Sequence, residues 1–594
     1  MKRTAFLKVT ALLLALITAL TLMTACEGNG NGNGSGGENG NGDGNTNTAP
    51  TYDLTGYTLV RCDDLSSKAT EYFAKVKQAL LDSVGVDLSV NIDVDFDETE
   101  KEILVGNTNR KESLETIKYL ENKNEKESYA IRFYPNKIVI TGTDDASTLR
   151  AMQVFVKEYV NVSQKGSGIN ISAGNQKLGI YDADSIVTLK NGTEISIDYV
   201  SPVIEVTQRY TLPDGTYFIP QSGSYPAITQ LNYQSNEEYN GRLIAIYSGG
   251  ATVDTTNGDG NVMMSDDDGL TWSCIARPRE VLYPALSARA SMAHVYELPA
   301  QVGDMPAGTL LYSYNSVNYD NNNNGINGKS ILAVWRSLDG GYTWEEYVII
   351  DEARGIKEGI WEPFMIYCEE DQYLYCFYSD DSDPDHDQKL SYKRSKDGVN
   401  WEGEGGKIGT GTGKDVEPVD VVAINDFSYR PGMAVITKMG NGEYFLVYEQ
   451  FGDWSGCPIY YKKTKDLSDW GDPSDIGTRL KDPANTVNAS APCCAWLPVG
   501  GECGTLFVTS KASTNRGYIF VSTDYGETWE TIEDPLESDP IKPDGGDRVG
   551  YSAGMWVGAD NKTLYYINSD NSAKKKDTQV IYFVKMTLFE KIDD

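Results

Sequence analysis

Two glutamates interrupt apolar stretches of the sequence where a structural role alone is hard to justify. Glu362 lies in GIWEPFMIY, at the head of an expected strand, and Glu449 lies in YFLVYEQF, near the end of another. Cleavage of a glycosidic bond usually needs two carboxyl groups about 5 to 10 Å apart. The neighbouring Trp361 would exclude water from Glu362 and raise the pKa of its carboxyl, which suits a general acid. Both glutamates are therefore candidate catalytic residues; the structural alternative is an edge-strand charge paired with Arg430 or a lysine.

Other catalytic chemistries find little support in the sequence. The chain has only two histidines, His294 and His386, and neither has a convincing nucleophile nearby in the sequence, which argues against Ser-His-Asp and Cys-His hydrolases. The loop that begins at Asp320 matches the first half of a calcium-binding loop, but Ile331 stands where a glutamate ligand is needed. We expect no cofactor and no metal at the active site, and calcium at such a loop would be structural.

A recurring stretch indicates the elements that must position the two carboxylates. SLDGGYTW reappears four times, twice in full and twice one residue shorter, with starts at 265, 337, 395, 464 and 522. Its aspartate can accept hydrogen bonds from the N–H groups that follow, its glycine can adopt positive φ, and its tryptophan can turn inward between neighbouring sheets. Such intervals are typical of four-stranded propeller blades with long loops. About 414 residues at roughly 69 per blade predict six blades, one of which lacks the stretch because strands from both ends close its sheet.

The chain is expected to divide into four segments. Residues 1–25 are predicted to be a lipoprotein signal peptide, since basic residues precede an apolar run that is short for a membrane span and ends before Cys26. Residues 26–50, rich in Gly and Asn, cannot bury apolar surface and predict a flexible linker. Residues 51–180 alternate helical and strand patterns, whereas residues 181–594 are rich in short strands. The predicted fold class is mainly β, a six-bladed β-propeller preceded by a small α/β accessory domain.

The net negative charge of the chain excludes some classes of binding partner. Asp and Glu number 86 against 52 Lys and Arg, which gives a net charge of −34. Such a surface repels nucleic acid and anionic lipid, so neither is an expected partner. We expect an oligo- or polysaccharide substrate and a monomeric protein.

Several motifs resemble known families. The recurring stretch resembles the Asp box, or BNR repeat, of the sialidase superfamily, which implies a propeller whose boxes lie on outer hairpins, away from the active site. LMTAC resembles the bacterial lipobox, which implies a lipid on Cys26 as the only membrane contact, at the extracellular face of the cell membrane. WEP at 361–363 and the RPGM and YE segments at 430–433 and 448–449 are most similar to the glycoside hydrolase family 93 exo-arabinanases. That resemblance implies a retaining exo-glycosidase with Glu362 as acid/base and Glu449 as nucleophile, and a neutral, arabinan-like polysaccharide as substrate.

Tyr551 is a third candidate catalytic residue, because GYSAGMWV resembles the segment with the tyrosine that is the nucleophile of sialidases and lines the site in family 93. The candidate substrate-binding residues are Trp361, Arg430, Tyr225 and Arg289.

Two alternatives stay open. Exo-α-sialidases clamp the substrate carboxylate with three arginines, and SYPAITQL has Ala227 where the first is wanted, although Arg289, Arg430, Arg516 and Arg548 could supply others. A non-catalytic glycan-binding lipoprotein is the second alternative, and it would not need two carboxylates at one pocket.

Overall fold

The computed structural model describes most of the chain after residue 50. The described residues are 51–594 except 122–127, 164, 167, 172–175, 180–185, 207, 257, 280–289, 320–325, 356–358, 453–456, 482–489, 511–517, 537–548, 571–579 and 591–594. Tyr52–Asp594 form one compact unit. The predicted signal peptide, Cys26 and the linker lie outside the described residues. Among the described helices, none combines the length and apolar character that crossing a bilayer requires.

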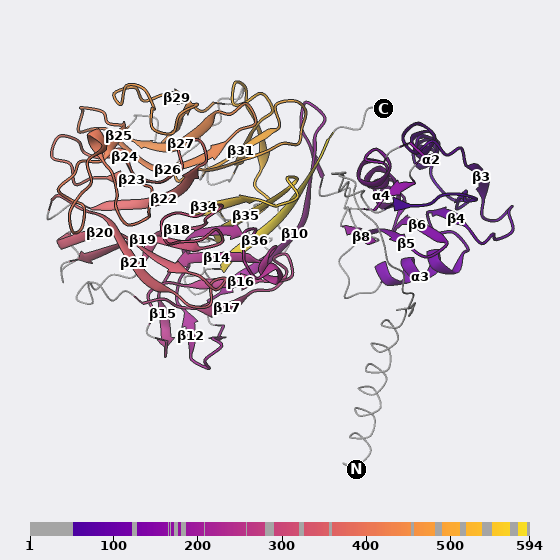
Figure 1. Cartoon of the computed structure of the whole chain (residues 1–594), viewed down its shortest axis with the longest axis horizontal. Coiled ribbons are helices and arrows are strands. Elements are labelled where there is room, and N and C mark those ends of the chain that lie inside the picture. The colour runs from indigo at the N-terminus through magenta and orange to yellow at the C-terminus, as the bar shows by residue number, and fades with distance from the viewer. Residues whose placement is uncertain are drawn as a thin grey trace, which may run out of the picture. The chain divides into compact units, whose positions relative to one another are not determined.

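The first described elements form a mixed sheet with three α-helices (Figure 1). In spatial order the strands are β3 (Ser89–Ile92), β2 (Thr58–Arg61), β4 (Glu102–Val105), β6 (Lys137–Gly142), β5 (Tyr129–Phe133) and β8 (Gln176–Gly179). The helices are α2 (Ser67–Ala79), α3 (Lys111–Leu120) and α4 (Asp145–Phe155), and β1 (Thr51–Tyr52) pairs with β7 (Ile169–Asn170). Ser66 and Asp144 cap α2 and α4 by accepting hydrogen bonds from backbone N–H groups of the first turn.

From β9 onward the described chain folds mainly into antiparallel sheets, which are numbered here in chain order. The first sheet holds β13 (Ser224–Gln230), β14 (Leu243–Ser248), β16 (Val262–Ser265) and β17 (Ser273–Ala276). The second holds β18 (Ser291–Glu297), β19 (Leu310–Tyr319), β20 (Ile326–Ser337) and β21 (Glu345–Glu352). The third holds β22 (Ile360–Cys368), β23 (Tyr373–Asp380), β24 (Lys389–Ser395) and β25 (Val419–Val422).

The remaining sheets follow the same order. The fourth holds β26 (Arg430–Lys438), β27 (Tyr444–Phe451), β28 (Ile459–Thr464) and β29 (Thr478–Arg479). The fifth holds β30 (Cys493–Leu497), β31 (Thr505–Ser510), β32 (Tyr518–Ser522) and β33 (Glu530–Glu533). The sixth holds β34 (Val549–Val557), β35 (Thr563–Asp570), β36 (Val580–Phe589), β10 (Glu194–Glu205) and β9 (Ile186–Thr188), so it joins strands from both ends of this region. A small sheet of β11 (Tyr210–Thr211), β12 (Tyr217–Pro220) and β15 (Ala251–Asp254) accompanies the first.

The first strands of these sheets form a closed ring. Each of β13, β18, β22, β26 and β30 contacts the next, and β34, the first strand of the sixth sheet in spatial order, contacts both β30 and β13. We call these six strands the ring strands. Figure 1 shows β22 and β26 nearer the middle of the β-rich part than β25 and β29. Sheets that radiate from a common centre in this way make a β-propeller, and apolar faces of adjacent sheets pack together to form its core.

The recurring stretch forms the turn between the third and fourth strands of the first five sheets, and its predicted hydrogen bonds are present. Asp339 Oδ1 accepts from Thr343 N at 2.9 Å, Asp339 Oδ2 accepts from Thr343 Oγ1 at 2.6 Å, and Gly341 has a φ of 97°. Trp344 Nε1 donates to Gly341 O at 2.8 Å. The equivalent tryptophans pack between sheets as predicted, since Trp470 of the fourth sheet lies 6.1 Å from Phe377 of the third, measured between ring centroids.

Candidate active site

Every ring strand carries a backbone irregularity close to its first residue. At the same place in each sheet a non-glycine residue has a positive φ, between 48° and 67°: Tyr225, Met292, Glu362, Met433, Ala491 and Ser552, with Ser490 before Ala491 as a second in the fifth sheet. In five of the six sheets the pairing register with the second strand shifts at this point, which marks a β-bulge. Left-handed backbone is costly for such residues and tends to occur at functional sites. We call these six positions the inner bulges, and Glu362 is the one that carries a carboxylate.

The inner bulges leave only a short signal in the sequence, and the sequence alone did not predict them. Each bulge residue is followed by Pro or Ala, in SYPA, SMAH, WEPF, GMAV, SAPC and YSAG. The pattern recurs once in each sheet, but only the shared position in the structure shows that these tetrapeptides are equivalent.

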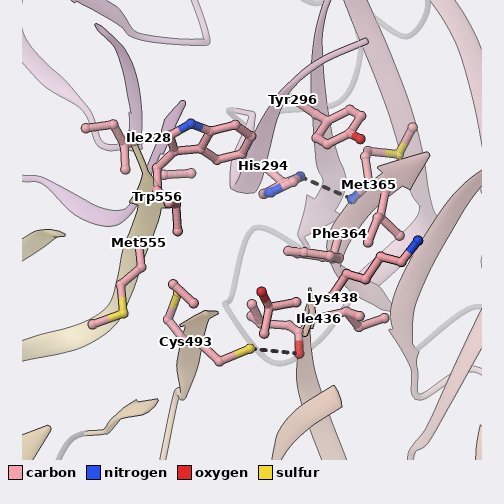
Figure 2. A pocket seen from close by; sticks show the side chains of 18 of the residues that line it. Ile228, His294, Tyr296, Phe364, Met365, Ile436, Lys438, Cys493, Met555 and Trp556 are labelled. Atoms are coloured by element: carbon pink, nitrogen blue, oxygen red, sulfur yellow. Dashed lines mark hydrogen bonds between the residues drawn. The ribbon is translucent and has the colours of Figure 1, made fainter. Parts of the chain in front are cut away.

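The ring strands enclose a cavity of about 750 Å³ whose lining includes Glu362 and four other bulge residues. The lining continues along the strands, for example from Met433 to Lys438 on β26. Figure 2 shows the rings of Trp556, His294 and Phe364 around the same space. Aromatic faces of this kind suit the apolar faces of sugar rings.

Glu362 is held in an environment that favours its protonated form. Burial raises the pKa of its carboxyl from 4.5 to about 7, and the negative charge of Glu449 acts in the same direction. A hydrogen bond from Ser379 Oγ to Glu362 Oε2, 2.7 Å long, and the backbone N–H of Met433 oppose that rise. A carboxyl with a pKa near neutral pH is suited to donate and accept a proton during a reaction.

Glu449 lies on β27, directly across the strand pair from Gly432. Its Oε2 accepts hydrogen bonds from Ser490 Oγ at 2.9 Å and from Ala491 N at 2.7 Å, which fix the orientation of the carboxylate. A Cβ placed on Gly432 would lie 3.6 Å from Ser379 Oγ and 3.7 Å from Glu449 Oε1. Because Ser379 Oγ is itself 2.7 Å from Glu362 Oε2, these distances place the two carboxylates no more than about 10 Å apart. Paired glycosidase carboxyls are separated by about 5 to 10 Å.

Of the expected substrate-binding residues that the structure describes, Tyr225 lines the cavity, whereas Trp361 and Arg430 are not among its lining residues. Tyr225 lines the cavity as an inner bulge, and Trp361 is half-buried directly before Glu362. The guanidinium of Arg430 forms ion pairs with Asp381 at 3.1 Å and Asp387 at 3.2 Å.

Other expected residues cannot be placed. Arg289, Arg516 and Arg548, together with the loop at Asp320, lie outside the described residues. Tyr551 belongs to β34, next to the bulge at Ser552, but its side chain is outside what the structure describes. Among the described residues that line the cavity, none is an arginine.

His294 and Ser379 are site residues that sequence reasoning did not select. Burial lowers the pKa of His294 to about 3, so the ring is neutral, and its Nδ1 accepts a hydrogen bond from Met365 N at 3.1 Å (Figure 2). Ser379 lies near the end of β23, just before an acidic loop, and nothing in its sequence context indicates a contact with Glu362.

No family model matches the chain, and no curated relative was found for it. Solved structures do match. The glycoside hydrolase family 93 α-L-arabinofuranosidase of Fusarium graminearum, solved with arabinobiose, is 22% identical with a TM-score of 0.51, over 65% of this chain and 97% of that one. The α-L-arabinanase of Penicillium chrysogenum, also complexed with arabinobiose, is 26% identical with a TM-score of 0.51, over 65% and 98%. The chain therefore shares the propeller fold of these glycoside hydrolases.

Proposed function

We propose that this protein is a retaining exo-glycosidase that releases terminal sugars from a neutral, arabinan-like polysaccharide. The observation that carries the proposal is the pair of carboxylates: Glu362, which lines the cavity among the ring strands and whose pKa is raised to about 7, lies no more than about 10 Å from Glu449. The likeness to the α-L-arabinanase of Penicillium chrysogenum, solved with arabinobiose, supports the choice of substrate class.

The proposed reaction is a double displacement. Protonated Glu362 donates its proton to the leaving glycosidic oxygen while the Glu449 carboxylate attacks the anomeric carbon, which leaves a glycosyl-enzyme ester and an ionised Glu362. Glu362 then takes a proton from water as that water attacks the anomeric carbon and releases Glu449. The first step leaves Glu362 without its proton, and the second step restores that proton and frees the Glu449 carboxylate, so the two steps together return the pair to its starting state.

The character of the cavity favours a neutral substrate. Its described lining combines aromatic and apolar side chains with three glutamates, Glu297, Glu362 and Glu369, against one lysine, Lys438, so its charge does not attract an anionic sugar. A sialic acid carboxylate would call for an arginine clamp, which the described lining does not supply.

We further propose that the sheets are the blades of a six-bladed propeller, that residues 51–180 are an accessory domain, and that lipid on Cys26 anchors the protein outside the bacterial cell. The linker of 26–50 would give the enzyme reach toward an insoluble polymer. Labelling with a radioactive fatty acid, in wild type and in Cys26→Ser, tests the anchor.

Incubation of the purified protein with arabinan oligomers and with a sialyl substrate tests the activity. We expect arabinose release from the oligomers, abolished in Glu362→Gln and in Glu449→Gln, and retention of anomeric configuration by NMR of the first product. Release of sialic acid would support the sialidase alternative. Binding of arabinan without hydrolysis would support the glycan-binding alternative.

A further inference from the structure

We propose that Ser379 is a positioning residue that determines which oxygen of Glu362 carries the catalytic proton. The proposal deepens the proposed function, since it rests on Glu362 acting as the acid/base. Among the described residues, positions equivalent to Ser379 occur in two other sheets, but only Ser379 also donates a hydrogen bond to an inner-bulge carboxylate, that of Glu362.

The repeated feature is a hydrogen bond between neighbouring sheets. The residue that precedes the inner bulge pairs with a residue of the second strand in the same sheet. That partner is Ser248 in the first sheet, Ser379 in the third and Glu449 in the fourth. Each accepts a hydrogen bond from the bulge N–H of the next sheet: Met292 N to Ser248 Oγ at 2.9 Å, Met433 N to Ser379 Oγ at 3.1 Å, and Ala491 N to Glu449 Oε2 at 2.7 Å. This shared bond is structural, because it ties consecutive bulges together.

Ser379 makes one further bond, to Glu362 Oε2 at 2.7 Å. A serine hydroxyl has a single proton to donate, and a backbone N–H can only donate. Ser379 Oγ accepts from Met433 N–H and donates its single proton to Glu362 Oε2. Ser379 is fully buried, so water does not readily take its place.

The consequence is a fixed proton position on Glu362. An oxygen that accepts a hydrogen bond from Ser379 is the carbonyl oxygen of the protonated carboxyl, so the acid proton resides on Oε1. Oε1 then delivers the proton to the leaving oxygen and later takes one from water. Ser379 keeps donating to Oε2 in both steps, so no proton passes through the serine.

Ser379→Ala tests this role. Loss of the donor removes a bond that stabilises ionised Glu362, so we expect the alkaline limb of the kcat/KM profile on arabinan oligomers to move to higher pH. We also expect kcat to fall about 10- to 100-fold with little change in KM, since the carboxyl is less well oriented. Ser379→Thr, which keeps the hydroxyl, should restore both the limb and most of the rate.

Ser248→Ala is the matched control. It removes the equivalent bulge bond in the first sheet and leaves the partner of Glu362 intact, so the alkaline limb should stay where it is in wild type. If Ser379→Ala and Ser248→Ala alter stability and activity alike and neither moves the limb, Ser379 is only structural and the proposal is wrong.

A second readout does not depend on the substrate. Titration of the ¹³C carboxyl signal of Glu362, assigned by its loss in Glu362→Gln, should show a higher pKa in Ser379→Ala than in wild type or Ser248→Ala. A wild-type protein that hydrolyses no glycan would overturn the proposed function, whereas an unchanged Glu362 titration in Ser379→Ala would overturn the role of Ser379.

Discussion

Two features recur around the propeller: the turns formed by the recurring stretch, here called the outer turns, and the inner bulges. Their side chains are alike in the outer turns and different at the inner bulges. The outer turns repeat the same chemistry, with a serine or threonine, an aspartate and a tryptophan at matching places in five sheets. The inner bulges repeat a backbone conformation and vary the side chain through Tyr, Met, Glu, Ala and Ser. The same side chains recur where they stabilise a turn, whereas the side chains differ at the inner bulges, five of which line the cavity.

The largest expected effect comes from neutralising one carboxylate in each region. Glu362→Gln should lower kcat on arabinan oligomers by about 10²- to 10⁴-fold, because the amide cannot donate the acid proton. Asp339→Asn, the corresponding change in an outer turn, should leave kcat within about twofold of wild type. Initial rates on one oligomer, with thermal melts to verify folding, check both. Equal losses in the two variants would contradict the division of roles.

The pH dependence of activity should follow Glu362. Its pKa of about 7 means that the acid form is lost above neutral pH, so kcat/KM should fall about tenfold per pH unit on the alkaline side. A profile of kcat/KM from pH 4 to pH 10 measures this limb. If kcat/KM falls only above pH 9, the fall reports the titration of a group other than Glu362.

The same carboxyl should make stability depend on pH. The folded protein holds the Glu362 proton more tightly than the unfolded chain does, because the pKa rises from 4.5 to about 7. The contribution of this group to the free energy of unfolding is therefore full below pH 4.5 and is lost as the pH rises to about 7. Denaturant unfolding at several pH values should show that Glu362→Gln gains stability relative to wild type at pH 8 but not at pH 4.

Asp339→Ala should destabilise the fold without affecting the reaction. The substitution removes two hydrogen bonds that Thr343 donates, so we expect a loss of about 1 to 2 kcal/mol in the free energy of unfolding. Urea denaturation measures the loss, and an unchanged kcat on arabinan oligomers serves as the control. A selective fall in kcat would show that the outer turns influence the active site.

The smallest expected effect is that of Thr343→Val, which keeps the side-chain volume. It removes the Oγ1 bond to Asp339 and leaves the backbone bond from Thr343 N in place, so the loss should be about 0.5 to 1 kcal/mol. The same urea series resolves it from the loss in Asp339→Ala. A loss equal to that of Asp339→Ala would mean that the backbone bond contributes nothing.

Prediction from sequence succeeded where the relevant interactions are local. The hydrogen bonds of Asp339, the positive φ of Gly341 and the inward tryptophan all lie within eight consecutive residues, so residue types and spacing were sufficient to predict them. Glu362 and Glu449 could be selected because each interrupts an apolar strand, which leaves a visible mark in the sequence. Arg430 shows the limit, since its ion pairs with Asp381 and Asp387 depend on a loop that the sequence does not place beside it.

The sequence by itself determined that the chain is built mainly of short strands with one recurring turn, because strand alternation and turn chemistry are properties of neighbouring residues. Only the tertiary structure decided that Ser379 meets Glu362 and that Glu449 comes near both, because those meetings depend on strand register and on contacts between sheets. Ser379 and Glu449, 70 positions apart, become neighbours only when the third and fourth sheets pack side by side, and burial within that arrangement raises the pKa of Glu362.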